Sequence, residues 1–271
     1  ELWHAIVLGV VQGLTEFLPI SSSGHLVLTR ELLPGMDEEN SDANIMFAVA
    51  VHVGTLFSVL IYFHKRILEL IRGMFKKPVS AEHRVAFFIV IASVPAVVAA
   101  LTLKPYFEQA FDSPYFTSWM LIVTGALLVL PRFIKIKPKA DNPEGEVTLL
   151  GAIVMGIGQA VAILPGISRS GSTIASGMLA GVNPSKAAEF SFLMAIPVIA
   201  GGAVFEFKDL EVVPPGMWLN CGIGAAVAFV TGLFAVYWVL DSIRRGKFEY
   251  FALYCVLVGI GGIVYFGFVK S

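Results

Sequence analysis

Charged residues are scarce in this sequence. Asp, Glu, Lys and Arg together make up 14% of the 271 residues, whereas hydrophobic residues make up 56%. A soluble domain usually has about 25% charged residues, because a water-facing surface needs them. The shortage therefore argues against a soluble enzyme and against a disordered chain. With a mean hydropathy of +0.79, the composition predicts a polytopic membrane protein.

Cysteine and basic charge are also in short supply. The net charge is −1, so the chain has no basic excess, and we expect no nucleic-acid partner. The two cysteines, Cys221 and Cys255, lie inside apolar runs and form no CxxC motif. We expect both to be small buried residues. We expect no cleavable signal peptide, because the first residues lack a basic segment and polar residues interrupt the first apolar run.

Long apolar stretches dominate what is present. A helix that spans a bilayer needs about 20 mostly apolar residues. The stretches that meet this requirement, and that we predict to be six spans, are 44–63, 85–103, 115–133, 186–206, 217–240 and 250–269. We therefore predict an all-α polytopic membrane protein in which residues 1–271 form a single integral membrane domain.

Two further apolar regions are each broken by a polar segment. The first extends over residues 2–33 with a break at 19–24, and the second over residues 149–182 with a break at 165–171. The piece after each break is too short to cross a bilayer. A break at membrane depth is tolerated only where protein or a water-filled cavity surrounds it. We interpret both regions as re-entrant helix hairpins, which return to the side from which they enter.

Lys and Arg are concentrated in alternate loops. The basic segments are 64–84, 132–147 and 241–247, together with Lys186, whereas the intervening segments 31–42 and 209–211 are acidic. By the positive-inside rule, the basic segments are cytoplasmic. The first hairpin then opens outward, the second opens inward, and both ends of the chain lie on the outer side.

The two halves of the chain match each other. The pairs at a constant offset of 147 residues include Gly9 and Gly156, Gln12 and Gln159, Ser21 and Ser168, and Ser23 and Ser170. Each half has one hairpin and three spans, and the charge pattern gives the halves opposite orientations. We interpret residues 1–140 and 147–271 as inverted-topology repeats. In this architecture the broken helices meet near the midplane and form the functional site.

Ionisable residues inside apolar segments are costly, so they are the first candidates for function. They are Glu16, His25, His52, Arg169 and Glu189. We favour structural roles for His52 and Glu189, because neither lies in a break. Structural alternatives stay open for the others: a buried ion pair between Glu16 and Arg169, and a hydrogen bond between His25 and a backbone carbonyl.

The residues of the two breaks favour a multi-oxygen anion. Residues 21–23 and 168–170 include serines suited to helix N-caps, and a helix N-terminus attracts anions. Arg169 adds a planar cation that suits a phosphate. Because Glu16 would repel a phosphate, we expect a divalent cation between them. Mg²⁺ or Ca²⁺ fits best, since the sequence has no His/Cys cluster.

The sequence around these residues resembles a known family. QGLTEFLPISSSGH at 12–25 closely resembles the first signature of the BacA/UppP family of undecaprenyl-diphosphate phosphatases, and PGISRSG at 165–171 is similar to the second. HVGT at 52–55 and EFSF at 189–192 also resemble family segments. The resemblance covers essentially the whole chain.

The resemblance implies a multi-pass enzyme of the bacterial inner membrane. Such an enzyme removes the terminal phosphate of undecaprenyl diphosphate, recycles the lipid carrier for cell-wall synthesis, needs a divalent cation and is linked to bacitracin resistance. The resemblance therefore implies a polyprenyl diphosphate lipid, held within the membrane, as the substrate. The resemblance leaves open whether the protein forms a homodimer.

The family's catalytic region falls on matching positions of this chain. We expect the catalytic residues to be Glu16, Ser22, His25 and Arg169, with Glu16 also the metal ligand. The expected substrate-binding residues are Gln12, Ser21, Ser23, Ser168, Ser170 and Gln159. Position 12 is Gln where some members have a second Glu, which leaves Glu16 as the main anionic ligand.

Two questions of mechanism stay open at the level of sequence. The nucleophile is either Ser22, activated by His25 three residues later, or a water molecule directed by His25 or Glu16. Because the first hairpin opens outward, we expect the active site to be reached from the outer side. The alternative function is a lipid-phosphate flippase or an anion transporter, since transporters also use inverted repeats with broken helices.

Overall fold

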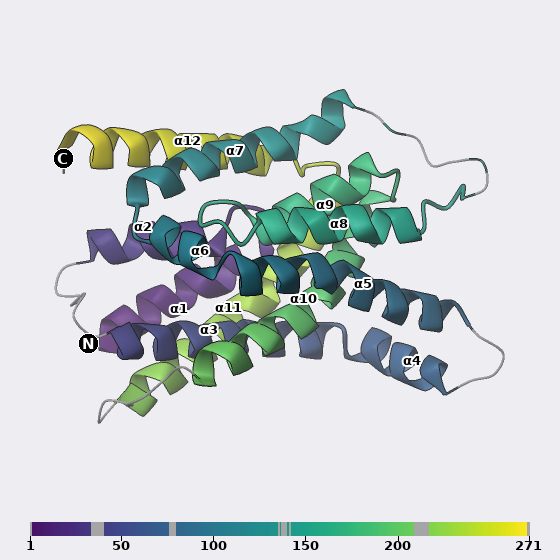
Figure 1. Ribbon diagram of the computed structural model, residues 1–271, viewed down its shortest axis with the longest axis horizontal. Coiled ribbons are helices and arrows are strands. Elements are labelled where there is room, and N and C mark those ends of the chain that lie inside the picture. Colours follow the sequence, from purple (N-terminus) through teal and green to yellow (C-terminus); the bar gives the residue numbers. More distant parts are fainter. Residues whose placement is uncertain are drawn as a thin grey trace.

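The computed structural model describes residues 2–33, 41–75, 80–134, 136, 140, 142–208 and 217–269. All regular elements within these residues are helical. They are α1 (Leu2–Phe17), α2 (Ser22–Leu32), α3 (Ser41–Tyr62), α4 (His64–Met74), α5 (Ala81–Thr102), α6 (Lys104–Phe111), α7 (Pro114–Phe133), α8 (Leu149–Val161), α9 (Arg169–Leu179), α10 (Pro184–Lys208), α11 (Met217–Arg244), α12 (Tyr250–Val264) and a π-helical end, η1 (Tyr265–Val269). Figure 1 shows them as a bundle of elongated, roughly aligned helices.

Within the described residues, six helices are long and apolar enough to cross a membrane, in agreement with the six predicted spans. They cover Ala43–Tyr62, Ala81–Thr102, Pro114–Phe133, Pro184–Glu206, Met217–Arg244 and Tyr250–Val269. Most of their predicted ends agree with the structure to within a few residues. The largest differences are the start of α5 and the end of α11, where polar residues beyond the apolar run continue the helix.

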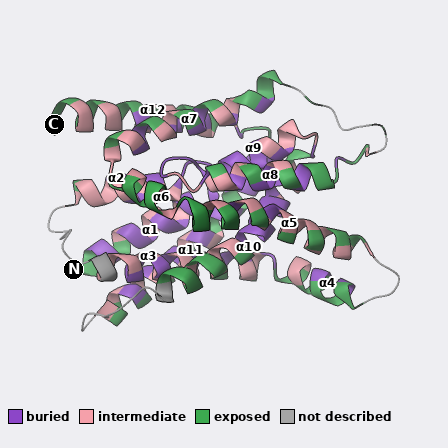
Figure 2. Ribbon diagram, viewed as in Figure 1, coloured by how far each residue is buried: buried purple, intermediate pink, exposed green. Residues whose placement is uncertain are grey.

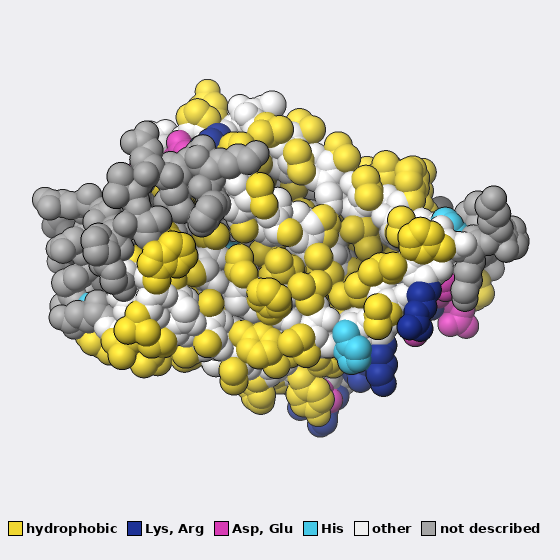
Figure 3. Space-filling view, turned by 90° about the horizontal axis from the view of Figure 1, so that it is seen from below, with side chains coloured by type: hydrophobic (Ala, Val, Ile, Leu, Met, Phe, Trp, Pro, Cys, Tyr) yellow, Lys and Arg dark blue, Asp and Glu magenta, His cyan; other side chains and the backbone are white. Residues whose placement is uncertain are grey.

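The outer surface of the bundle is apolar, as a membrane-embedded protein requires. Buried residues gather in the middle of the bundle (Figure 2), where Phe17 of α1 packs edge-on against Phe192 of α10 with ring centroids 5.7 Å apart. Hydrophobic side chains cover most of the face in Figure 3, and Lys and Arg side chains appear mainly toward one end.

The described basic segments lie at the end of the bundle opposite the two chain ends. In Figure 1 the N and C labels are on the left, whereas α4 and the starts of α5 and α8 are on the right. Lys65, Arg66 and Arg72 belong to α4. Several charged residues used in the topology prediction lie outside the described residues: Asp37, Glu38, Glu39, Lys76, Lys77, Lys135, Lys137, Lys139, Asp209, Glu211 and Lys270.

The two broken regions form two pairs of short helices. α1 ends at Phe17 and α2 begins at Ser22, and α8 ends at Val161 while α9 begins at Arg169. The first break falls at the predicted place, because Pro19 cannot continue a helix. The second helix of that pair starts at Ser22, directly after its cap Ser21, which is one of the serines predicted as N-caps.

Close backbone packing fixes α1 against α11. A Cβ atom built on Gly13 would lie 1.9 Å from Thr231 Oγ1 and 2.6 Å from the Ala228 carbonyl oxygen. Only glycine therefore fits at this position without moving α11 away. The contact holds the helix that carries Gln12 and Glu16 in a fixed place within the bundle.

Candidate active site

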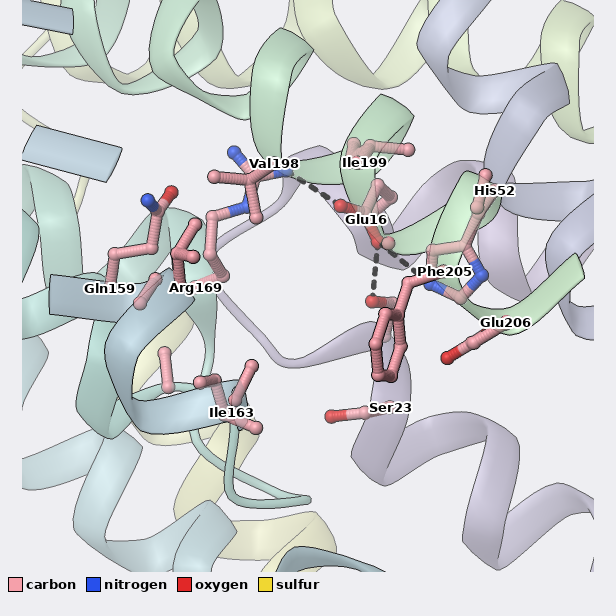
Figure 4. A pocket seen from close by; sticks show the side chains of 18 of the residues that line it. Glu16, Ser23, His52, Gln159, Ile163, Arg169, Val198, Ile199, Phe205 and Glu206 are labelled. Carbon is pink, nitrogen blue, oxygen red and sulfur yellow. Dashed lines mark hydrogen bonds and ion pairs between the residues drawn. The ribbon is translucent and has the colours of Figure 1, made fainter. Parts of the chain in front are cut away.

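A pocket of about 460 Å³ lies where the two breaks meet the long helices. One part of its wall is polar and includes Glu16, Arg169 and Gln159 (Figure 4), together with Ser22. The rest is mostly apolar and comes largely from two spanning helices. These residues are Ala96, Val97, Ala100 and Leu101 of α5, and Pro197, Val198, Ile199 and Phe205 of α10. The pocket therefore joins a polar centre to an apolar wall.

The first break is held by the cap of α2. The Ser21 side chain accepts a hydrogen bond from the backbone N–H of Gly24 over 3.2 Å, and its hydroxyl lies 3.2 Å from that of Ser23. Ser21 has a φ of 72°, which is unusual for a residue other than glycine. The turn at Ser21 brings Ser22, the first residue of α2, back toward the end of α1.

The second break is built in the same way. Ser168 caps α9 by accepting a hydrogen bond from the backbone N–H of Gly171 over 3.1 Å, and its hydroxyl lies 3.3 Å from that of Ser170. Thr124 of α7 supports this turn, because its hydroxyl accepts from the Ser168 N–H over 3.0 Å and donates to the Gly166 carbonyl over 2.8 Å. The N-cap predictions for Ser21 and Ser168 are therefore confirmed.

The two breaks contact each other directly. Ser170 donates a hydrogen bond to the Leu18 carbonyl oxygen over 3.1 Å. Gly24 packs so closely that a Cβ atom on it would lie 2.9 Å from the Cα atom of Gly166. The ends of two helix pairs that are far apart in the sequence are thus brought together in the middle of the bundle.

Glu16 is the centre of the hydrogen bonds in the pocket. Its Oε1 atom accepts from Arg169 Nη2 over 2.6 Å, and its Oε2 atom accepts from Ser22 Oγ over 2.6 Å and from Gln12 Nε2 over 3.0 Å. Glu16 is only 7% exposed. The ion pair with Arg169, one of the alternatives for these two residues, is present, and Arg169 Nη1 also donates to the Ser191 carbonyl over 3.3 Å.

His52 is closer to this centre than the sequence analysis expected. Its Nε2 atom lies 3.9 Å from Glu16 Oε2, and its side chain lines the pocket. Its Nδ1 atom lies 2.7 Å from the Ala48 carbonyl oxygen, so Nδ1 carries a hydrogen and Nε2 faces Glu16. Glu189, by contrast, is absent from the pocket wall formed by the described residues, and it accepts from Arg66 Nε over 2.9 Å.

No hydrogen bond joins His25 to Ser22 among the described residues, which does not favour the alternative in which His25 activates this hydroxyl. The His25 Nδ1 atom lies 2.7 Å from the Ser21 carbonyl oxygen, and its Nε2 atom lies 2.9 Å from the Tyr254 hydroxyl. Residues three apart share a helix face, but Ser22 turns toward Glu16 while the His25 ring bends back to the cap. The alternative of a hydrogen bond to a carbonyl at the break is what the structure contains.

Two buried amides have atoms without partners. Gln12 Oε1 and both amide atoms of Gln159 lack a hydrogen-bond partner among the described residues. Gln12 and Gln159 are 0% and 2% exposed, and buried polar atoms usually have a hydrogen-bond partner. Gln159 lines the pocket, so its two amide atoms can meet a ligand there.

The oxygen atoms near Glu16 suit a hard cation. Glu16, the partnerless Oε1 of Gln12 and the Ser22 hydroxyl are oxygen donors of the kind that Mg²⁺ and Ca²⁺ prefer. The described residues contain no group of three or more His, Cys, Asp and Glu side chains suited to a metal. The donor set therefore fits an ion bound partly by a ligand, and it does not fit a protein-only zinc site.

Six apolar helices are long enough to cross a membrane, and the Glu16 carboxylate among them binds the Arg169 guanidinium and the Ser22 hydroxyl. This combination defines a multi-pass membrane protein with a polar pocket. Residues 5–261 match the family model described as bacitracin resistance protein BacA, and the chain belongs to this family.

Relatives are similar over nearly the whole chain. A protein named undecaprenyl-diphosphatase from Salinibacter ruber is 44% identical over 95% of this chain and 96% of its own length. Proteins of the same name from Parabacteroides distasonis and Bacteroides fragilis are each 39% identical, over 95% and 97% of this chain and 96% and 98% of their own lengths.

Proposed function

We propose that this chain is an undecaprenyl-diphosphatase, which hydrolyses undecaprenyl diphosphate to undecaprenyl phosphate and inorganic phosphate. The observation that carries the proposal is the contact of Glu16 with both Ser22 and Arg169 at the polar end of an apolar pocket. The family and the names of the relatives support the same substrate. A lipid diphosphate needs both parts of such a pocket.

Ser22 is the nucleophile in the proposed reaction. Its Oγ atom attacks the terminal phosphorus, Glu16 Oε2 takes the hydroxyl proton, and the bond to the bridging oxygen breaks to release undecaprenyl phosphate. A water molecule then hydrolyses the phosphoserine and frees inorganic phosphate. The 2.6 Å contact between Ser22 and Glu16 supports Glu16 as the base in this proposal, in place of His25, whose Nδ1 atom lies against the Ser21 carbonyl.

Arg169 stabilises the negative charge that builds up on the transferred phosphoryl group. Its guanidinium is held by Glu16 and by the Ser191 carbonyl, so it is fixed before the substrate arrives. α2 and α9 begin at Ser22 and Arg169, which both line the pocket, and a helix N-terminus attracts anions. His25 positions the first break through the Ser21 carbonyl and does not touch the reacting atoms.

The remaining polar residues of the breaks hold and bind the substrate. Ser21, Ser168 and Ser170 shape the two turns. Ser23, Ser168 and Gln159 line the pocket and face the substrate in this proposal. Glu16 and the Oε1 atom of Gln12 would hold a divalent cation, Mg²⁺ or Ca²⁺. When bound, this ion neutralises part of the charge of the diphosphate.

The chain has the topology of an inverted repeat in this proposal, with α1–α2 and α8–α9 as re-entrant hairpins. α1 runs toward the middle from the left end of Figure 1 and α8 from the right end, which supports opposite orientations. The basic end of the bundle is cytoplasmic by the positive-inside rule, so both chain ends face outward. The site then opens to the outer side, and the protein lies in the bacterial inner membrane.

The proposed function is tested by phosphate release from undecaprenyl diphosphate by the purified protein in detergent. We expect release by the wild type and very little by the Arg169→Ala variant. Movement of the lipid across sealed vesicles without any phosphate release would instead support the flippase alternative. In vesicles of known orientation, substrate added on the outer side should be hydrolysed, and hydrolysis only of substrate on the cytoplasmic side would contradict the orientation.

A further inference from the structure

Gln159 is a buried polar side chain for which the described protein supplies no partner. It is 2% exposed, and neither its Oε1 nor its Nε2 atom has a hydrogen-bond partner among the described residues. A buried amide without partners is costly. Because Gln159 lines the pocket, a ligand in the pocket can supply what is missing.

Gln12, the counterpart of Gln159 in the first half of the chain, identifies the kind of partner. The two glutamines are 147 residues apart and lie near the ends of α8 and α1. Gln12 donates its Nε2–H to the carboxylate of Glu16, four residues later, over 3.0 Å. The residue four positions after Gln159 is Ile163, which also lines the pocket. Gln159 therefore has the same amide donor as Gln12, but it has no carboxylate four residues later to accept the hydrogen bond.

The surroundings of Gln159 favour an anion as well. In Figure 4, Arg169 lies between Gln159 and Glu16, so that the guanidinium is the charged group next to the amide. The acidic residues among those described around the pocket are Glu16 and Glu206, and both are drawn on the far side of Arg169 from Gln159. An oxygen of a negatively charged ligand can enter between Gln159 and Arg169 and accept from both.

We propose that Gln159 binds the phosphate that stays on the lipid and thereby selects a diphosphate attached to a polyprenyl chain. This assignment rests on the proposed function, in which Ser22 attacks the terminal phosphate on the Glu16 side of Arg169. The second phosphate of the same substrate then lies on the other side of Arg169, where the Gln159 Nε2–H donates to one of its oxygens. The apolar residues Ala162 and Ile163, which follow on the same wall, lie next to the start of the lipid tail.

The test compares binding of two anions by purified full-length protein in detergent. Gln159→Met keeps the length of the side chain and removes both hydrogen-bonding atoms, and Gln159→Leu is a second variant in case one of them folds poorly. Thr117→Val is the matched control, because Thr117 is also buried with a partnerless side-chain oxygen but is not part of the described pocket wall. The dissociation constants of undecaprenyl phosphate and inorganic phosphate are measured by calorimetry, and the melting temperature of each variant is recorded.

We expect Gln159→Met to weaken the binding of undecaprenyl phosphate about tenfold, as for the loss of a hydrogen bond to a charged group. The affinity for inorganic phosphate should stay within about twofold of the wild type, and the melting temperature should not fall, because no protein contact is lost. Unchanged affinity for undecaprenyl phosphate, or an equal loss for inorganic phosphate, would overturn the assignment. A wild type that binds the lipid phosphate but releases no phosphate from the diphosphate would instead overturn the proposed function.

Discussion

Ser22 Oγ donates a 2.6 Å hydrogen bond to Glu16 Oε2 across the break between α1 and α2. The two residues lie in different helices, and the turn at Ser21 brings them together. A carboxylate in this position is a suitable base for the hydroxyl, and its other oxygen is bound to Arg169. The contact joins the proposed nucleophile and the proposed base to the Arg169 guanidinium in one hydrogen-bonded group.

Replacing Ser22 with Ala should lower phosphate release about 10³-fold or more, because the proposed nucleophile is lost. With substrate labelled on the terminal phosphate, the wild type should form an acid-stable phosphoserine that the variant lacks. Ser93→Ala is the control, since Ser93 donates to the Ile89 carbonyl within α5 and does not line the described pocket. Near-normal turnover by the Ser22 variant would leave only the mechanism in which a water molecule attacks.

Arg169→Lys should lower kcat about 100-fold even though the positive charge is kept. A lysine cannot donate in two directions in one plane, as Arg169 does to Glu16 and to the Ser191 carbonyl. Steady-state kinetics separates the loss in kcat from any change in KM. If the lysine variant works as well as the wild type, the guanidinium geometry has no part in the reaction.

Tyr254→Phe tests the positioning role of His25. The variant removes the 2.9 Å contact between the Tyr254 hydroxyl and His25 Nε2 but leaves the contact of Nδ1 with the Ser21 carbonyl. We expect a decrease of less than about tenfold in kcat/KM, together with a lower melting temperature, since one hydrogen bond is lost. A loss as large as that of Ser22→Ala, at an unchanged melting temperature, would place His25 in the chemical step instead.

Removal of divalent cations by EDTA should stop phosphate release, and added Mg²⁺ or Ca²⁺ should restore it. Gln12→Leu removes the partnerless Oε1 atom next to Glu16, so this variant should need about tenfold more Mg²⁺ for half-maximal activity. The concentration dependence of phosphate release on Mg²⁺ measures this shift. An unchanged Mg²⁺ requirement in the Gln12 variant would exclude Gln12 as a ligand.

The sequence predicted the elements that depend on local chemistry. The six spans follow from runs of apolar residues, and Ser21 and Ser168 are caps because their side chains satisfy N–H groups a few residues later. The first break follows from Pro19. Spacing along the chain was sufficient for these features, since each involves residues close in sequence.

Contacts between distant segments were not predictable in the same way. His52 lies in α3 and comes close to Glu16 only because the helices pack together. His25 contacts Tyr254, which lies far from it in the sequence. Ser22 and His25 are three residues apart on one helix, a spacing that suggested that they interact. The strained turn at Ser21 instead directs the two side chains to different partners. Side-chain direction at a helix N-terminus depends on the turn before it, which residue type alone does not determine.

The most direct test of the account measures phosphate release from undecaprenyl diphosphate by two separate variants, Glu16→Gln and, as its control, Glu189→Gln. Both variants neutralise a glutamate that pairs with an arginine, but Glu16 lies in the pocket and Glu189 pairs with Arg66 of α4. We predict at least about a 100-fold loss for Glu16→Gln, because glutamine cannot take the Ser22 proton, and near-normal release for Glu189→Gln. A folded Glu16→Gln protein that releases phosphate at the wild-type rate would contradict the account.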